Sequence, residues 1–209
     1  MIIISHRGYW KSLAEKNTLT AFNHSISLNL GTETDIRDSL GRLVISHDMP
    51  LGNEMLFDDF LKLWPKNEQL PLALNVKADG LALKLKQTLD LHDYHNYFLF
   101  DMSIPDMVQC LKQGLKVFAR VSELEPKPCC YQQVVGVWLD AFYDDWYSPA
   151  QISQFLDDNK MVCLVSSELH GRNPDKLWQM LLDSQLNQHP NLMLCTDKPE
   201  EAIALLGSE

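Results

Sequence analysis

The sequence predicts an α/β fold, a single (β/α)₈ TIM barrel with residues 1–209 as one domain. Three observations predict it. Short apolar runs recur along the chain, segments with a helical spacing of apolar residues lie between them, and polar residues that can carry chemistry follow many of the runs. With 209 residues, 45% of them hydrophobic, the chain can bury one substantial core, although it is short for a barrel.

Eight apolar runs are expected to be buried parallel strands, because each is short and helical segments separate them. The expected strands are 2–5, 32–36, 72–76, 97–100, 116–121, 134–139, 161–165 and 192–195. Between them, apolar residues recur at helical spacing, as in Leu19, Phe22 and Ile26. Helix-start signals such as Ser148-Pro149 precede these segments, which supports the alternation of strand and helix.

The stretch DSLGRLVISHD interrupts the alternation after the second strand. We predict a small inserted hairpin here, with a turn around Gly41 and a short strand over residues 43–46. The alternative architecture is an open doubly wound sheet. Such a sheet would usually carry a Gly-rich phosphate-binding turn after its first strand, and no such turn is present in this sequence.

Composition narrows the partners that the protein can have. The formal net charge of -10 argues against a nucleic-acid partner. The opening apolar run is too short for a membrane span or a signal-peptide core. Five cysteines without a CxxC pair argue against a structural zinc site and fit a reduced protein, so we expect a cytoplasmic location. The sequence carries no signal for the oligomeric state.

In a (β/α)₈ barrel, catalytic residues lie at the carboxyl ends of the strands. The polar side chains expected there are His6, Arg7, Glu33, Asp35, His47, Asn75, Lys77, Asp101, Arg120 and Glu168. For each of these residues taken singly, the alternative is that it is an ordinary surface residue where a strand ends and a loop begins.

Glu33 and Asp35 are two residues apart, so on a strand they point to the same face. Two carboxylates side by side in a barrel mouth repel each other, and a divalent cation would offset that repulsion. Oxygen ligands favour Mg²⁺ or Ca²⁺ over zinc. The alternative is a buried ionic network in which Arg7 and Lys77 balance the two carboxylates.

Aromatic residues crowd the loop after the sixth strand, at Phe142, Tyr143, Trp146 and Tyr147. Their faces, beside neighbouring carboxylates, suit a sugar ring or a cationic head group. The alternative is a loop that its aromatic residues anchor on the barrel. We expect substrate contacts from four residues at this and other strand ends: Asp101, Arg120, Trp146 and Glu168.

Several ordered motifs resemble the glycerophosphodiester phosphodiesterases, relatives of the phosphatidylinositol-specific phospholipases C. The family pattern is HRG, then P-E-N-T-x-x-A-F, then G-x-x-x-E-x-D-V, then D-G-x-x-V-x-x-H-D, and a closing T-D-x-P. The matching residues are His6-Arg7-Gly8, Asn17-Thr18, Ala21-Phe22, Gly31, Glu33, Asp35-Ile36, Gly41, Val44, His47-Asp48 and Thr196-Asp197-Lys198-Pro199. The match covers the first 48 residues and the last strand, and the middle of the chain matches only as strand–helix alternation.

The resemblance implies metal-dependent hydrolysis of a small phosphodiester. His6 and His47 would be the general acid–base pair, because imidazoles titrate near neutrality. Arg7 would hold the phosphate, and Lys77 would face it. Two alternatives stay open: a phospholipase-C-like reaction that yields a cyclic phosphate, and a degenerate, non-catalytic barrel that binds a phosphorylated sugar or head group.

Glu33 and Asp35 would bind the metal in this family, with a third ligand from the next strand. At the position of that third carboxylate this sequence has Asn75, and Lys16 stands where the family has Glu. A neutral amide removes one negative charge, which predicts weakly bound Mg²⁺ or Ca²⁺ unless Asp101 or Glu168 replaces the missing carboxylate. The stretch between Asp48 and Asn75 also leaves little room for the family's helical insertion, which weakens the link to a glycerol-containing substrate.

Overall fold

A computed structural model describes residues 1–66 and 70–207 of the chain. It divides into two compact units, one formed by His6–Val117 and the other by Met1–Ser5 with Phe118–Glu209. Each unit is built from strands and helices that alternate along the chain. No helix in these described ranges is long and apolar enough to cross a bilayer. That residues 1–209 form a single domain stays a prediction.

The described residues of the unit His6–Val117 form three parallel strands and one antiparallel hairpin strand. The parallel strands are β2 (Gly31–Ser39), β4 (Leu72–Val76) and β5 (Tyr97–Phe100), and the hairpin strand is β3 (Arg42–Ile45). The helices are α1 (Leu19–Ser27), α2 (Phe57–Leu63), α3 (Ala82–Leu91) and α4 (Ile104–Lys112), with a short 3₁₀ turn η1 (Leu13–Glu15). In the register of β2 and β4, Asp35 lies directly opposite Asn75, which brings both polar side chains to one place in the sheet.

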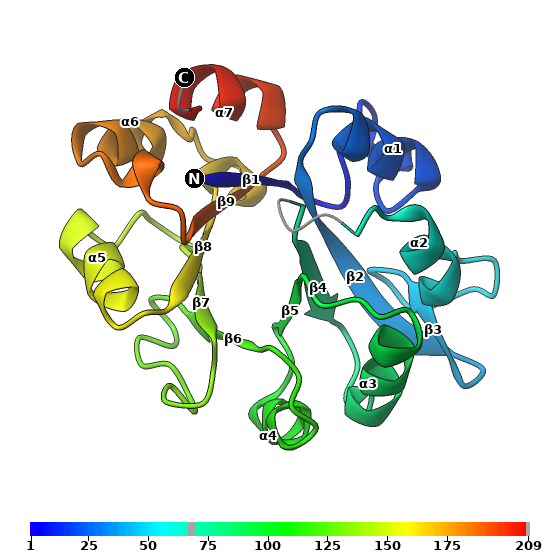
Figure 1. The fold of residues 1–209 in the computed structure, drawn as a ribbon. Coiled ribbons are helices and arrows are strands. Elements are labelled where there is room, and N and C mark those ends of the chain that lie inside the picture. Colours follow the sequence, from blue (N-terminus) through cyan, green and yellow to red (C-terminus); the bar gives the residue numbers. More distant parts are fainter. Residues whose placement is uncertain (67–69, 208–209) are drawn as a thin grey trace. The chain divides into compact units, whose positions relative to one another are not determined.

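The second unit contains five parallel strands. They are β1 (Ile2–Ser5), β6 (Phe118–Val121), β7 (Gly136–Leu139), β8 (Met161–Val165) and β9 (Leu192–Thr196). The helices are α5 (Pro149–Asp157), α6 (Asp175–Asp183) and α7 (Pro199–Leu206), with two 3₁₀ turns, η2 (Ser167–His170) and η3 (Leu186–Gln188). Figure 1 shows these three helices along one side of their strands. Most residues of these strands are buried, as their apolar runs predict, whereas Arg120 within β6 is only half-buried.

The predicted fold class is confirmed: parallel strands alternate with helices along the chain as in a (β/α)₈ TIM barrel. The runs 72–76, 97–100 and 161–165 match β4, β5 and β8 residue for residue. Two connections differ from the simple alternation. Helix α2, which the apolar spacing did not indicate, follows the hairpin, and residues 122–135 between β6 and β7 form turns without a helix.

The inserted hairpin is present, one residue earlier than expected. Strands β2 and β3 pair antiparallel, with Ser39 opposite Arg42. The two turn residues between them, Leu40 and Gly41, have φ angles of 50° and 78°. Two consecutive left-handed residues are the geometry of a tight hairpin turn whose twist matches that of the strands. The hairpin therefore sets the position of His47, two residues after β3.

Gly8 allows the chain after β1 to pass close to helix α1. Its φ is 77°, and a Cβ built on it would lie 2.7 Å from Ala21 Cβ and 2.9 Å from the Ala21 carbonyl carbon. The backbone N–H of the next residue, Tyr9, donates to the Ala21 carbonyl at 3.0 Å, so the two segments cannot separate easily. The close packing against α1 therefore explains why a glycine follows His6 and Arg7.

We expect Gly8→Ala to lower the free energy of unfolding by about 3 kcal/mol, because it adds a left-handed alanine and a clash with α1. Urea unfolding followed by circular dichroism measures the change. The matched control is Gly80→Ala, since Gly80 has φ 85° but nothing within 4 Å of the added Cβ. Equal losses in the two variants would contradict the close-packing explanation.

Candidate active site

A chain of ion pairs connects four of the predicted site residues within the unit His6–Val117. Arg7 Nε lies 3.0 Å from Asp35 Oδ2, and Lys77 Nζ lies 3.4 Å from Asp35 Oδ1. Lys77 Nζ is also 3.9 Å from Asp101 Oδ2. The Asp35 side chain is fully buried, whereas the other three are 20–24% exposed. The buried carboxylate therefore has two cationic neighbours that reach solvent, which is the ionic network that the sequence left open.

Three residues of this region have backbones in the left-handed region. The φ angles are 57° for Arg7, 59° for Asn17 and 70° for Asp101. Residues other than glycine adopt such angles at a cost, and they concentrate where the surrounding structure holds a functional geometry. Arg7 and Asn17 are also hydrogen-bonded to each other, because Asn17 N–H donates to the Arg7 carbonyl at 2.9 Å.

Asn17 is a site residue to which the sequence analysis gave no role. Its Nδ2 donates to Asp35 Oδ2 at 2.8 Å, and its Oδ1 accepts from the Thr34 hydroxyl at 2.8 Å. The side chain therefore fixes one oxygen of Asp35 and ties the loop after β1 to strand β2. Its place in the N-T-x-x-A-F motif was the available signal, but only the folded chain shows what the amide contacts.

Glu33 lies next to Asp35 on the same face of β2, as the spacing predicted, and its side chain is almost completely buried. Its Oε2 accepts the Arg7 backbone N–H at 3.1 Å and lies 3.9 Å from His6 Nε2. Burial, and then the neighbouring charge of Asp35, raise the pKa of Glu33 to about 8, although Arg7 and Lys77 act in the opposite direction. Without a cation, Glu33 is therefore largely protonated at neutral pH.

Two buried oxygen atoms fit a hard cation. Among the described residues, neither Asp35 Oδ1 nor Asn75 Oδ1 accepts a hydrogen bond. They belong to residues that are directly opposite in the β2–β4 register. Lys77 Nζ lies 3.4 Å from Asp35 Oδ1, and a cation would also give the buried Asn75 oxygen the partner that such atoms usually have. Carboxylate and amide oxygens are the ligands that Mg²⁺ and Ca²⁺ prefer. The donor set of Glu33, Asp35 and Asn75 is thus chemically suited to such an ion.

The number of anionic ligands is nevertheless small. In the described part of the chain, no group of three or more His, Cys, Asp or Glu side chains is placed to hold a metal ion. Within the unit His6–Val117, Asp101 therefore does not complete a three-carboxylate set with Glu33 and Asp35. Weak binding, as predicted from Asn75, remains the expectation because affinity follows ligand charge.

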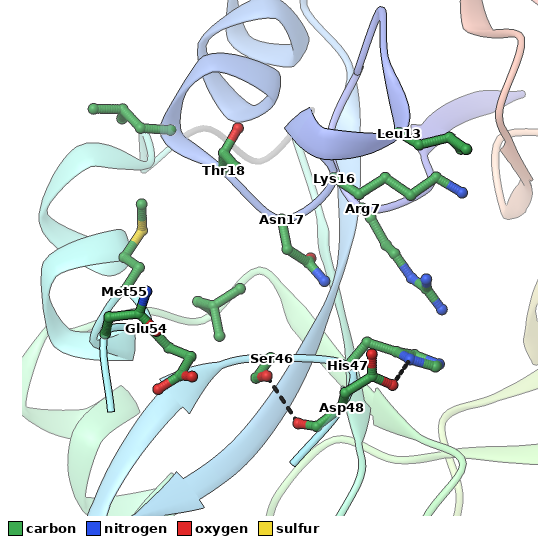
Figure 2. A pocket seen from close by; sticks show the side chains of 13 residues that line it. Arg7, Leu13, Lys16, Asn17, Thr18, Ser46, His47, Asp48, Glu54 and Met55 are labelled. Carbon is green, nitrogen blue, oxygen red and sulfur yellow. Dashed lines mark hydrogen bonds and ion pairs between the residues drawn. The ribbon is translucent and has the colours of Figure 1, made fainter. Parts of the chain in front are cut away.

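A cleft of about 770 Å³ opens beside this network, within the same unit (Figure 2). Arg7, Lys16, Asn17 and His47 line it, and Figure 2 shows the Arg7, Lys16 and His47 side chains extending toward the same side. The His47 side chain is 44% exposed, and its Nδ1 lies 2.8 Å from Asp48 Oδ1. The cleft therefore gathers a guanidinium, an ammonium and an imidazole in a space large enough for a small ligand.

Lys16 adds a positive charge to this cleft. Its ammonium lies 4.4 Å from the centre of the Trp10 ring, a cation–π contact that orients the side chain. The preceding residue, Glu15, does not replace the family's glutamate in the cleft, because its carboxylate accepts the Lys11 backbone N–H at 2.7 Å. The departure from the family pattern thus changes the charge of the cleft itself.

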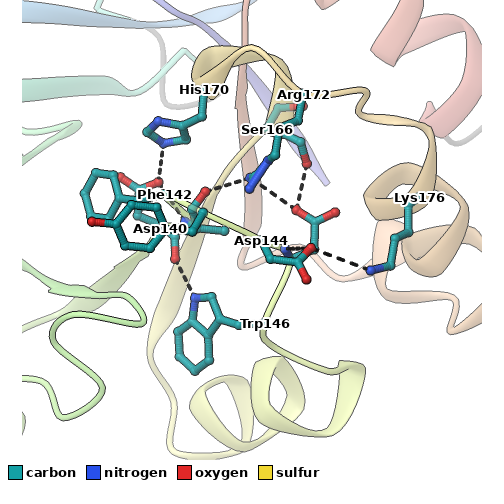
Figure 3. Close-up of polar contacts among 12 residues, drawn as sticks. Asp140, Phe142, Asp144, Trp146, Ser166, His170, Arg172 and Lys176 are labelled. Atoms are coloured by element: carbon teal, nitrogen blue, oxygen red, sulfur yellow. Dashed lines mark hydrogen bonds and ion pairs between the residues drawn. The ribbon is translucent and has the colours of Figure 1, made fainter.

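Three of the residues predicted to contact the substrate belong to the second unit, and the side chain of each has a partner within that unit. Trp146 Nε1 donates to the Asp140 carbonyl at 2.9 Å (Figure 3), and Arg120 pairs with Glu125. Glu168 accepts from the hydroxyls of Ser166 and Thr196 and from the backbone of Asp197. These contacts support the view that the aromatic loop and the end of β8 are anchored structurally. The substrate contacts of Arg120, Trp146 and Glu168 stay predictions.

No protein-family model and no curated protein sequence matches the chain. Solved structures do. A protein of Galdieria sulphuraria assigned as a glycerophosphodiester phosphodiesterase has a TM-score of 0.77 at 16% identity, with 99% of this chain and 98% of that chain covered. The glycerophosphodiester phosphodiesterase of Agrobacterium tumefaciens has a TM-score of 0.69 at 15% identity, with both chains covered completely, 100% and 100%. A Ca²⁺-dependent phosphatidylinositol-specific phospholipase C of Streptomyces antibioticus has a TM-score of 0.54 at 12% identity, with 99% and 96% covered.

These similarities define the class of fold: an α/β TIM barrel of the kind that phosphodiesterases use. More particularly, the chain has the fold of the glycerophosphodiester phosphodiesterases over its full length, with the phosphatidylinositol-specific phospholipases C as further structural neighbours. The fold thus agrees with the resemblance that the sequence motifs indicated.

Proposed function

We propose that the protein hydrolyses a small phosphodiester with the help of a divalent cation, by acid–base catalysis with His6 and His47. The observation that carries the proposal is the position of Arg7. Its Nε pairs with the buried Asp35, while the same side chain lines the cleft that His47 also lines. A guanidinium held in this way presents its remaining donors to an anion in the cleft, and its planar fork matches the geometry of a phosphate.

The two histidines differ in their surroundings, which suits different roles. When His47 donates from Nδ1 to Asp48, its Nε2 is the atom that exchanges a proton with the substrate. His6 lies against the carboxylate of Glu33 and is mostly buried, with a side chain 16% exposed. In the proposed reaction one imidazole activates the attacking water, and the other protonates the leaving alkoxide.

Glu33, Asp35 and Asn75 would hold Mg²⁺ or Ca²⁺. Once bound, the ion would supply positive charge that stabilises the phosphoryl oxygens in the transition state. Binding would also favour the deprotonated form of Glu33, because the cation offsets the repulsion from Asp35. Lys77 would keep its contact with Asp35 and face the phosphate, and Asn17 would hold Asp35 in place.

The expected result is turnover of a nitrophenyl phosphodiester that requires Mg²⁺ or Ca²⁺ and stops with a chelator. His6→Ala and His47→Ala should each lower kcat by about 10²–10⁴-fold, the usual contribution of a positioned acid or base. The matched control is His95→Ala, because the His95 side chain is 74% exposed and pairs with nearby Asp93, while its backbone carbonyl, which alanine keeps, accepts from Lys116. Turnover that survives both the chelator and His6→Ala would overturn the assignment.

One observation favours a non-catalytic alternative. Arg7 Nε and Lys77 Nζ both lie against Asp35, so these two charges can balance the buried carboxylate in a purely structural ion-pair cluster. A barrel of that kind would bind a phosphorylated sugar or head group in the cleft without turnover. Calorimetric binding of a glycerophosphodiester, with no product released after prolonged incubation with Mg²⁺ and with Ca²⁺, would establish the alternative. A cyclic phosphate product would instead indicate phospholipase-C-like chemistry.

A further inference from the structure

Two adjacent cysteines lie in the segment that connects β6 and β7 without a helix. The sulfur atoms of Cys129 and Cys130 are 3.6 Å apart, and both residues are half-buried. The other three cysteines, Cys110, Cys163 and Cys195, are completely buried at 0% exposure. The chain therefore has one pair of accessible thiols that already face each other, and three thiols that solvent does not reach.

The separation of these sulfur atoms suits a bridging atom better than a direct bond. A disulfide needs the sulfurs about 2.05 Å apart, and its Cα atoms are usually about 4.4–6.8 Å apart. Adjacent Cα atoms in a trans peptide are only about 3.8 Å apart, so a disulfide between neighbours is strained. A typical metal–thiolate bond is about 2.3 Å long. An ion at that distance from both sulfurs would have an S–ion–S angle of roughly 100°, and neither side chain would need to move.

We propose that Cys129 and Cys130 form a two-thiol binding site for a trivalent, thiophilic metalloid of the arsenite class. Soft thiolate ligands select soft ions. A pyramidal trivalent centre needs only two bonds from the protein, because its third bond goes to its own substituent or to a hydroxyl group. Zinc would need four ligands. No group of three or more His, Cys, Asp or Glu in the described ranges could supply them.

The protonation of Cys130 agrees with this chemistry. The hydrogen bond to Cys129, then burial and the nearby Cys129 charge, raise the pKa of Cys130 above its ordinary value, so this residue is a thiol at neutral pH. Attack on a disulfide requires a thiolate. Capture of an organoarsenous acid proceeds from two thiols: two As–O bonds break, two As–S bonds form, and the thiol protons leave with the oxygens as two water molecules. Arsenic stays trivalent, so no oxidant is needed.

The test uses the whole native protein and phenylarsine oxide, which in water supplies the organoarsenous acid. Intact-mass spectrometry should show one adduct per chain, and peptide mapping should place it on the segment that contains Cys129 and Cys130. Each of Cys129→Ser and Cys130→Ser should weaken binding by about 10²-fold, since a second attachment within one molecule acts at high effective concentration. 2,3-Dimercaptopropanol should remove the adduct, and an equal concentration of the monothiol 2-mercaptoethanol should not.

Three results would overturn the proposal. One is an adduct that persists at the same affinity in both single variants, and another is an adduct that 2-mercaptoethanol removes as readily as the dithiol. The third is that oxidised glutathione converts the pair to a disulfide, seen as a loss of two hydrogens in the intact mass, more readily than the pair captures the arsenical. That result would make the pair a redox couple instead. Circular dichroism of each serine variant separates loss of the site from loss of the fold.

Discussion

Arg7→Met is expected to lower kcat/KM for phosphodiester turnover by about 10²–10³-fold, the cost of one lost donor to a developing phosphoryl charge. The same substitution leaves the buried Asp35 carboxylate with one cationic neighbour fewer. We therefore also expect the free energy of unfolding to fall by about 3 kcal/mol, because breaking a buried ion pair leaves a charge without its partner. Steady-state kinetics and urea unfolding measure the two effects on the same preparations.

Arg7→Lys separates the two roles of the guanidinium. A lysine keeps a positive charge near Asp35 but lacks the planar fork that can contact Asp35 and a phosphate together. It should restore most of the stability while kcat/KM stays well below that of the parent protein. Arg42→Met is the control, because Arg42 is exposed on the hairpin strand β3. If Arg7→Met keeps its turnover and loses only stability, Arg7 is a structural residue alone.

Glu33→Gln is expected to change how stability depends on pH. In the folded protein without a cation the pKa of Glu33 is about 8, whereas its ordinary value is 4.5. The folded state therefore holds a proton that the unfolded state loses. The resulting stabilisation is complete below pH 4.5, declines as pH rises toward 8, and is absent above that. Glutamine has nearly the same shape, retains one side-chain carbonyl oxygen and is neutral at every pH, so this decline should disappear.

The measurement is urea unfolding of the parent protein and Glu33→Gln between pH 4.5 and 9 in the presence of a chelator. The advantage of the glutamine variant over the parent should grow with pH across this window. Added Mg²⁺ or Ca²⁺ should stabilise the parent at pH 8 and have much less effect on Glu33→Gln. Glu201→Gln serves as the control, since Glu201 is exposed on α7. Parallel stability curves for parent and Glu33→Gln would show that the buried carboxyl keeps its ordinary pKa.

The elements of this fold could be predicted largely from local patterns. Apolar runs of four or five residues mark buried strands whatever lies elsewhere in the chain, which is why β4, β5 and β8 were predicted with correct ends. The turn at Leu40-Gly41 likewise depends on a glycine that accepts a left-handed backbone. Helix α2 and the segment 122–135 were predicted less well, because a short helix and an irregular connection are stabilised by what they pack against.

The properties of the candidate site likewise fall into two groups: those that local sequence patterns predicted and those that depend on tertiary contacts. The sequence by itself determined that Glu33 and Asp35 share one face of a strand, because side chains alternate with a period of two. Its motifs also indicated which residue types could bind phosphate and move protons. Only the tertiary structure decided that Asn17 holds Asp35, that Arg7 joins the buried carboxylate to the cleft, and that burial raises the pKa of Glu33. These properties depend on contacts between residues that are 18 or more positions apart, and on exclusion of water from them. Local patterns do not encode either, because both arise only when the loop that carries Arg7 and Asn17 packs against the β2–β4 sheet.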